Sequence, residues 1–280
     1  RLKMRPDSHL VSREVVANGP LQLRVRCTYR VGPASTVVQD VVFHSSSPQI
    51  DFETVVDWAE KRTLMKTLFP LNVWAETARH EIQYGHAERP THTNLIQDRA
   101  RFEVCAHKWT DLSDDAYGVA LLNDSKYGVS VEGSEIGLSL LKSGVHPDPR
   151  GDAGRHQMTY SLLPHDGPFS VERVVRPAYE LNVAPIPVPA AADVEGLASM
   201  LSIDNPNVIV EAVKWAEEQD AFIIRLYEAG RGSAQARLVL GVPVEAVVET
   251  DLLEENPQPV HQDGDAVVLT FRPFEIKTLR

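Results

Sequence analysis

The strongest fold signal lies between Leu21 and Trp58, in the segment LQLRVRCTYRVGPASTVVQDVVFHSSSPQIDFETVVDW. Apolar and polar side chains alternate at its start, which places Leu23, Val25 and Cys27 on one face of an extended chain. Two clusters that are typical of turns, GPAS and SSSP, divide the segment into three β-rich runs. The pattern predicts consecutive antiparallel strands.

The same alternation continues along the chain, in the segments 63–69, 78–84, 101–109, 117–123, 135–141 and 156–163. Short strands separated by Gly, Pro, Asn, Asp and Ser predict a large antiparallel sandwich. One segment differs: SVERVVRPAYEL offers Ser170 as an N-cap and Glu172 in a first helical turn. Because Pro177 would interrupt a helix, we expect only one or two turns there.

A domain boundary is expected in the Pro- and Ala-rich stretch NVAPIPVPAAADVEG, since alternating prolines favour a stiff extended connector over a sheet. We therefore predict a large β domain over 1–184, a linker over 185–196 and a small β-sandwich over 197–280. Strand patterns resume after the linker, at 208–216, 221–229, 236–240, 244–253, 265–273 and 274–280. YEAGRGSA is interpreted as a hairpin turn between two of these strands, and Gly264 as a position with positive φ.

Charge and composition exclude several classes of protein. A net charge of −11 over 280 residues opposes binding to nucleic acid and to anionic membranes, because both need a cationic face. No apolar run approaches the ~18–20 residues of a membrane span. Two cysteines, Cys27 and Cys105, are too few for a disulfide framework and are interpreted as buried free thiols in a reducing compartment. The start at Arg1, without a signal segment, suggests a piece of a longer protein.

Catalytic motifs are missing from the sequence: it contains no GxSxG elbow, HExxH helix or phosphate-binding loop. His80, His86 and His92 recur at a spacing of six, which would align them on one continuous strand. Gly85 and Pro90 make such a strand implausible, so ordinary loop histidines are favoured over a metal site. The acidic loop DPRGD is likewise interpreted as a solvated turn rather than a calcium site. The residues alone thus indicate a two-domain β protein.

Three longer blocks carry a resemblance to a known family: HAERPTHTNLIQDRARFEVCAHKWTDLS (86–113), YGVALLNDSKYG (117–128) and GRHQMTYSLLPH (154–165). Together with the ending LTFRPFEIKTLR, they resemble the C-terminal half of the α-mannosidases of glycoside hydrolase family 38, closest to the cytosolic branch. The resemblance implies an all-β fold, with a large antiparallel β-supersandwich of the mutarotase-like kind followed by a small β-sandwich.

The resemblance also implies retaining hydrolysis of terminal α-linked mannose and a cytoplasmic location. In that family, zinc or cobalt is held by His and Asp residues of the N-terminal catalytic domain, and none of those motifs occurs in this chain. We therefore expect no catalytic residue, no metal ligand and no cofactor here, and no activity from the chain alone. The expected partners are an α-mannoside or oligosaccharide, the catalytic domain of the same protein, and other copies of the chain, which would meet through the surface left uncovered.

Turn residues at the junction with the catalytic domain are the candidates for contact with substrate. Rigid sheets commonly carry binding groups on their loops, and cations and hydroxyls can bind sugar hydroxyls while an aromatic ring stacks on a sugar. The candidate substrate-binding residues are Arg89, His92 and Asn94 in the polar turn ERPTHTN, Lys126 and Tyr127 after LLND, and Arg155 and His156 at the start of a strand. For each of them, packing at a domain interface or solvation in a turn is the competing interpretation. Trp58, Trp74 and Trp109 are interpreted as core or interface residues.

Two other functions compete with this one. A free-standing carbohydrate-binding β-sandwich would need a groove lined by exposed aromatic residues, whereas aromatic residues form only 7% of the chain. A structural or interaction sandwich without a ligand is the third alternative.

Overall fold

The computed structural model describes residues 8–189, 199–218 and 220–280. These residues form an almost entirely β protein, which confirms the predicted fold class. The chain divides into two compact units: the first comprises Arg1–Ile82, Ala87–Phe169 and Ala178–Asn182, and the second comprises Gln83–His86, Ser170–Pro177 and Val183–Arg280. Residues 190–196 of the predicted linker lie outside the described residues, so the predicted domain boundary stays a prediction.

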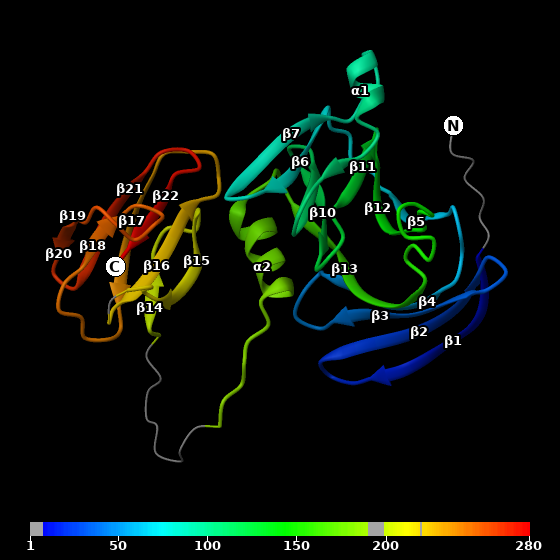
Figure 1. The fold of residues 1–280 in the computed structure, drawn as a ribbon, viewed down its shortest axis with the longest axis horizontal. Helices are drawn as coiled ribbons and strands as arrows, with labels where there is room; N and C mark the ends of the chain where they lie inside the picture. The colour runs from blue at the N-terminus through cyan, green and yellow to red at the C-terminus, as the bar shows by residue number, and fades with distance from the viewer. Residues whose placement is uncertain (1–7, 190–198, 219) are drawn as a thin grey trace. The chain divides into compact units, whose positions relative to one another are not determined.

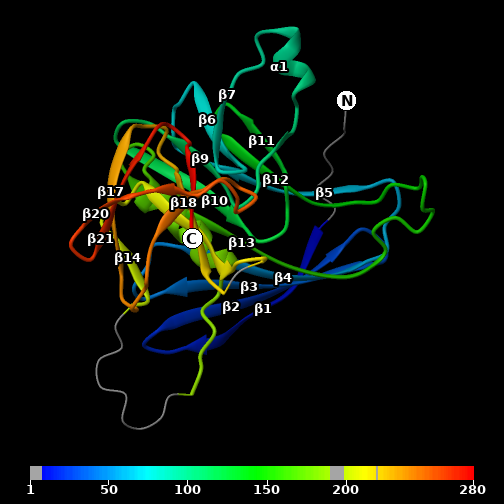
Figure 2. The same cartoon turned by 60° about the vertical axis from the view of Figure 1, so that its left-hand side comes forward.

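A nine-stranded sheet forms most of the first unit, in the order β1-β2-β3-β4-β13-β10-β9-β6-β7. Its strands are β1 (Ser8–Asn18), β2 (Gln22–Val31), β3 (Ser35–His44), β4 (Ile50–Trp58), β6 (Thr77–Ile82), β7 (Gly85–Pro90), β9 (Trp109–Ser113), β10 (Tyr117–Asn123) and β13 (Gly154–Asp166). β1 to β4 pair antiparallel in sequence order and lie side by side as the blue part of the ribbon (Figure 1, Figure 2). Their pairing confirms the three strands predicted over 21–58.

The second sheet of this unit contains β5 (Leu64–Pro70), β12 (Glu135–Lys142), β11 (Gly128–Glu132) and β8 (Val104–Cys105), in that order. Both sheets contribute to one hydrophobic core. Val56, Leu121 and Met158 come from the nine-stranded sheet, and Ile136 and Leu138 come from β12. Apolar side chains from facing sheets, buried in one cluster, are the hallmark of a β-sandwich.

The second unit is a smaller sandwich. One sheet has the order β14 (Leu201–Ile203), β17 (Ala234–Leu240), β21 (Ala266–Phe271) and β20 (His261–Asp263). The other has the order β15 (Val208–Trp215), β16 (Phe222–Glu228), β22 (Ile276–Leu279), β18 (Val248–Thr250) and β19 (Gln258–Pro259). Its core joins Leu226 and Leu279 of one sheet to Leu238 and Leu269 of the other.

Two local predictions for this smaller sandwich have opposite outcomes. Gly264 has a φ of +65° in the turn between β20 and β21, as predicted. YEAGRGSA does not form a hairpin turn, because β16 and β17, which it connects, belong to different sheets. The segment that contains these glycines therefore connects one sheet of the sandwich to the other.

The helix after β13 is longer than the sequence indicates. Ser170 is the N-cap, as predicted, because its Oγ accepts a hydrogen bond from the Arg173 N–H (3.2 Å). A π-helical turn, η1 (Val171–Val175), then leads directly into α2 (Arg176–Asn182). Pro177 lies where the π-helical turn passes into α2, a change of hydrogen-bonding pattern at which a missing N–H can be accommodated. The expectation that Pro177 stops the helix is thus wrong.

Several residues lie elsewhere than predicted. The segment 101–109 is not one strand: a short helix, α1 (Ile96–Ala100), precedes it, and only Val104 and Cys105 are in strand before β9. Cys105 is exposed rather than buried, whereas Cys27 is buried, and both are free. Trp58 and Trp109 are core residues, whereas Trp74 is 81% exposed, so it is not a core residue and its place at an interface stays a prediction. Of the helices in the described residues, none combines the length and apolar character needed to cross a bilayer.

Candidate functional site

Arg89, His92 and Asn94 occupy two different environments around the end of β7. Arg89 is in the strand itself, not in a turn, and its side chain is half-buried. His92 and Asn94 follow the strand and are exposed. The Nδ1 atom of His92 lies 3.6 Å from the Oδ2 atom of the buried Asp98, a distance at which protonation of the imidazole would create an ion pair.

Lys126 and Tyr127 lie in the loop between β10 and β11, where Asn123 fixes the backbone. The Asn123 Oδ1 atom accepts hydrogen bonds from the Ser125 N–H at 3.2 Å, as in an Asx turn, and from the Lys126 N–H at 2.7 Å. Tyr127 is 54% exposed, and its ring packs edge-on against His107 at a centroid distance of 5.4 Å. One edge of the Tyr127 ring is thus supported while much of the side chain remains open to solvent.

Arg155 and His156 lie in the first residues of β13, which pair with Asp57 and Val56 of β4. Arg155 is exposed. The Nε2 atom of His156 lies 2.6 Å from the carbonyl oxygen of Asp152, so this imidazole is engaged with the preceding loop.

The structure does not gather these candidates at one point. β11 separates the Lys126 group from the residues that follow Thr91. Tyr127 directly precedes β11, and its carbonyl accepts a hydrogen bond from the Ala106 N–H. Gly133 directly follows β11, and its N–H donates to the Thr91 carbonyl. A strand of five residues is about 16 Å long. Lys126 and Tyr127 therefore lie at the opposite end of β11 from the residues that follow Thr91.

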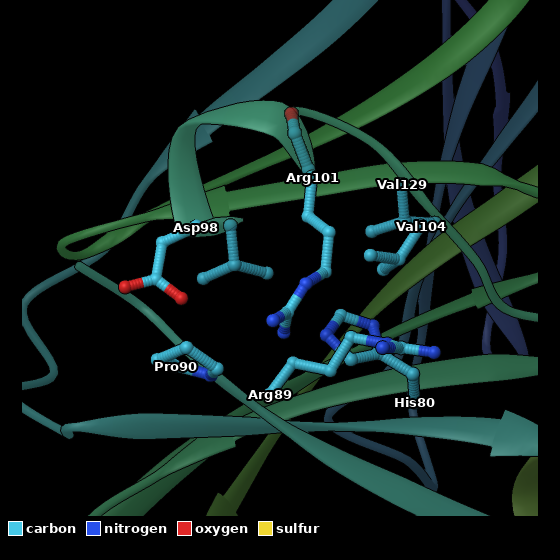
Figure 3. A pocket seen from close by; sticks show the side chains of 9 residues that line it. His80, Arg89, Pro90, Asp98, Arg101, Val104 and Val129 are labelled. Atoms are coloured by element: carbon cyan, nitrogen blue, oxygen red, sulfur yellow. The ribbon is translucent and has the colours of Figure 1, made fainter. Parts of the chain in front are cut away.

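A small cavity of about 30 Å³ lies in the first unit, and Arg89 is one of its lining residues. The other lining residues are His80, Pro90, Asp98, Arg101, Val104, Val129, Ser130 and Val131. In Figure 3 the side chains of Arg89 and Arg101 both approach the imidazole of His80, from different sides, whereas the carboxylate of Asp98 lies away from it. The Nε atom of Arg89 is buried and has no hydrogen-bond partner among the described residues.

His80 forms the floor of this cavity as an uncharged group. It is 2% exposed, and burial together with the positive charge of Arg89 lowers its pKa from 6.5 to about 4. Its Nδ1 atom lies 3.0 Å from the Thr110 hydroxyl oxygen, which orients the ring. At neutral pH the cavity therefore contains two arginine charges beside a neutral imidazole.

Glu81, next to His80 in β6, forms an ion pair with Lys108. Burial raises the pKa of the Glu81 carboxyl, and Lys108 opposes that effect through charge and hydrogen bonds. The Lys108 Nζ atom lies 3.2 Å from the carboxylate and 4.4 Å from the ring centre of Tyr179. This buried acid is thus paired, in contrast to the arginines of the cavity.

Sequence reasoning missed Asp98 and Arg101, and it favoured loop histidines over a metal site for His80 and His86. The loop interpretation is wrong for both, because His80 lies in β6 and His86 in β7, and both are buried. Arg101 was assigned to a strand, whereas it is the C-cap residue of α1. The only sequence signal for this helix is Asp98, three residues after Leu95: the Leu95 N–H donates to the Asp98 carboxylate at 3.1 Å, as in half of a capping box.

Within the described residues there is no group of three or more His, Cys, Asp and Glu side chains that could hold a metal ion. The zinc or cobalt that the family resemblance implies therefore does not find its ligands in this part of the chain.

Comparison with known families matches both ends of the chain. Residues 2–150 match the glycosyl hydrolases family 38 C-terminal domain, and residues 207–279 match the glycosyl hydrolases family 38 C-terminal beta sandwich domain. The two matches fall on the large and on the small sandwich, respectively.

Individual relatives agree with these family matches. The chain is 41% identical to the human alpha-mannosidase 2C1 over 256 residues, which is 89% of this chain and 25% of that protein. It is 38% identical to alpha-mannosidase G of Dictyostelium discoideum over 278 residues, 95% of this chain and 26% of the relative. The chain thus spans about a quarter of the length of the curated relatives that it matches.

A solved structure shows the same fold. The crystal structure of an alpha-mannosidase from Enterococcus faecalis V583 superposes with a TM-score of 0.79 at 19% identity, covering 98% of this chain and 35% of that one. Because the family matches span most of the sequence and the fold agrees, the chain belongs to glycoside hydrolase family 38, whose C-terminal domain and C-terminal β-sandwich domain it contains.

Proposed function

We propose that this chain is the non-catalytic, C-terminal part of a retaining α-mannosidase that hydrolyses terminal α-linked mannose. The observation that carries the proposal is the double match to the C-terminal domains of family 38, together with 38–41% identity to proteins named alpha-mannosidases. The chain packs on the catalytic domain of the same protein and helps to shape the sugar cleft. Zinc or cobalt belongs to that catalytic domain, and the enzyme is cytoplasmic and forms homo-oligomers.

Seven side chains of the large sandwich are proposed to contact the α-mannoside or oligosaccharide: Arg89, His92, Asn94, Lys126, Tyr127, Arg155 and His156. The exposure of His92, Asn94, Tyr127 and Arg155 supports this role, since side chains open to solvent can meet a ligand. The separation of the groups along β11 suggests that they meet different sugar units rather than one.

Activity measurements test this proposal directly. The purified chain alone should release no aryl alcohol from an aryl α-mannoside, with or without added zinc or cobalt, whereas the full enzyme should. Turnover by the chain alone that scales with its concentration would contradict the assignment of a non-catalytic role.

Variants of the full enzyme test the contact residues. His92→Ala and Asn94→Ala should each lower kcat/KM by about 2- to 10-fold, the value of one lost hydrogen bond. Thr93→Ala, between them in the same exposed loop, is the matched control and should leave kcat/KM unchanged. Equal effects at all three positions would assign the loop a structural role.

One observation favours the alternative of a carbohydrate-binding module. Trp215 is 62% exposed and stacks on Phe222, with ring centroids 4.2 Å apart and planes 25° from parallel. An exposed indole on a rigid support can bind a sugar face. Calorimetry with mannose oligosaccharides decides this alternative: heat of binding that disappears in Trp215→Ala supports it, and no heat from the unsubstituted chain excludes it.

A further inference from the structure

The cavity of Figure 3 has an unusual charge balance for this chain. Acidic residues outnumber basic ones by 39 to 28, so an arginine is more often near a carboxylate than near another arginine. Arg89 and Arg101 nevertheless line the same cavity, and neither forms an ion pair or a side-chain hydrogen bond with any of the described residues. Two positive charges in one cavity repel each other unless a negative charge lies between them.

The lining residues do not supply that negative charge. Asp98 is the only carboxylate among them, and it accepts the Leu95 N–H at 3.1 Å and faces His92 at 3.6 Å instead of either arginine. His80 is neutral. A buried Nε on Arg89 without a partner adds an unmet hydrogen-bond donor, which is costly in a folded protein.

From this arrangement we infer that Arg89 and Arg101 form a binding site for an oxyanion, a carboxylate or phosphate group that comes from outside the described residues. Planar guanidinium groups bind such groups through two parallel hydrogen bonds. Neutral sugar hydroxyls would satisfy the donors but would leave both charges uncompensated. The site therefore selects for charge, which distinguishes its ligand from a neutral mannoside; of the side chains proposed above as mannoside contacts, only Arg89 also belongs to this site.

Size limits what enters the cavity. A volume of about 30 Å³ holds one or two atoms of the size of a water oxygen. The oxygen atoms of the anion therefore enter between the arginines, and the rest of the ligand stays outside. The entrance lies on the side of Arg101, which is exposed, while His80 closes the floor.

Calorimetric titration of the whole 280-residue chain tests the site, with inorganic phosphate and with acetate as two probes at constant ionic strength. We expect at least one of them to bind. Arg101→Gln and Arg89→Gln should each weaken binding by about tenfold or more, the value of lost charge-assisted hydrogen bonds. Arg101→Lys, which keeps the charge but loses the planar fork, should bind with intermediate affinity.

Arg99→Gln is the matched control, because it removes the same charge from the same short helix. The Arg99 Nε donates to the Thr93 carbonyl at 3.2 Å, and Arg99 does not line the cavity. Its affinity should stay within about twofold of that of the unsubstituted chain. Circular dichroism of each variant verifies that the fold is retained. Because Arg101 is exposed, Arg101→Gln should fold normally and tests the site even if Arg89→Gln unfolds.

The two probes also distinguish the source of the anion. Preference for phosphate indicates a free phosphate-bearing ligand, whereas equal or stronger binding of acetate indicates a carboxylate side chain of another polypeptide segment. Absence of binding for both probes overturns the inference, and so does binding that Arg101→Gln leaves intact. The oxyanion site goes beyond the mannosidase function and does not rest on it, because its readout is a binding heat and not turnover.

Discussion

Single residues of the large sandwich are held by environments that the sequence does not reveal. His80 illustrates this, since a lone histidine at a strand position has no visible partner in the sequence. In the structure it lies beneath Arg89, contacts the Thr110 hydroxyl at 3.0 Å and is almost completely buried. Burial and the neighbouring charge both disfavour the imidazolium, so His80 links the stability of the protein to pH.

Lowering the pH from 6.5 to 4 should therefore reduce the free energy of unfolding through His80 by about 3 kcal/mol. The unfolded imidazole takes up a proton in this window and the folded one does not, whereas above 6.5 both are neutral and the contribution is complete. Chemical denaturation at several pH values in this range measures the free energy of unfolding. It should fall less steeply with decreasing pH in His80→Asn than in the unsubstituted chain. An NMR titration midpoint of His80 near 6.5 would contradict the prediction.

Gly118 in β10 is a second residue whose identity is fixed by its neighbours. A Cβ atom there would clash with His165 Cε1 and would lie 2.5 Å from Ser113 Cβ. His165 cannot easily move, because its Nε2 atom lies 2.8 Å from the buried carboxylate of Asp111. Gly118→Ala should thus lower the free energy of unfolding by about 1–3 kcal/mol, the usual cost of overpacking.

Gly19→Ala is the control for this substitution, because no atom beyond the adjacent residues of the chain lies within 4 Å of an added Cβ at that position. Its effect should stay within about 0.5 kcal/mol in the same urea denaturation experiment. If the two variants unfold at the same urea concentration, the close contacts around Gly118 are not what requires a glycine.

At the scale of elements, the sequence predicted strands well and short helices poorly. Alternation over 21–58 predicted β2, β3 and β4 correctly, because one face of each strand packs against the core and therefore carries apolar side chains. α1 has only five residues, too few for a helical period to show, and the apolar residues after it imitate a strand. β1 was missed because nearly all of its residues are exposed, so burial imposes no pattern on them.

The continuous helix from η1 to α2 depends on its start. Ser170→Ala removes the side chain that accepts the Arg173 N–H, and should lower the free energy of unfolding by about 1 kcal/mol. Ser170→Asp should restore most of this loss, since aspartate is an equally good N-cap and its charge suits a helix N-terminus. Thermal or urea unfolding followed by circular dichroism measures both; an unchanged Ser170→Ala variant would show that the cap contributes nothing.

At the scale of the whole molecule, alternation predicts strands but not their partners. β13 pairs with β4 and β10, which are distant from it in sequence, because side-chain periodicity assigns each strand a buried face and leaves its neighbours open. The candidate site shows the same limit. Its lining residues come from β6, β7, α1, β8 and β11, and only the three-dimensional pairing brings Arg101 to Arg89.

The two hydrophobic cores share no residue, so a defect in one should be felt mainly there. Leu138→Ala in the first unit and Leu226→Ala in the second should each cost about 2–5 kcal/mol, since both side chains are fully buried. Hydrogen exchange with mass spectrometry should show lost protection in β12 and its neighbours for Leu138→Ala, and in β16 and its neighbours for Leu226→Ala. Equal loss in both units for either variant would show that they unfold as one.

The contrast between the two thiols has a practical consequence. Cys105 is exposed and Cys27 is only 4% exposed, so a maleimide dye added to the native protein should react at Cys105 alone. A fluorophore can thus be attached beside β8 without any engineered cysteine. Energy transfer from that dye to an acceptor on another domain would then report, in solution, how closely the two approach.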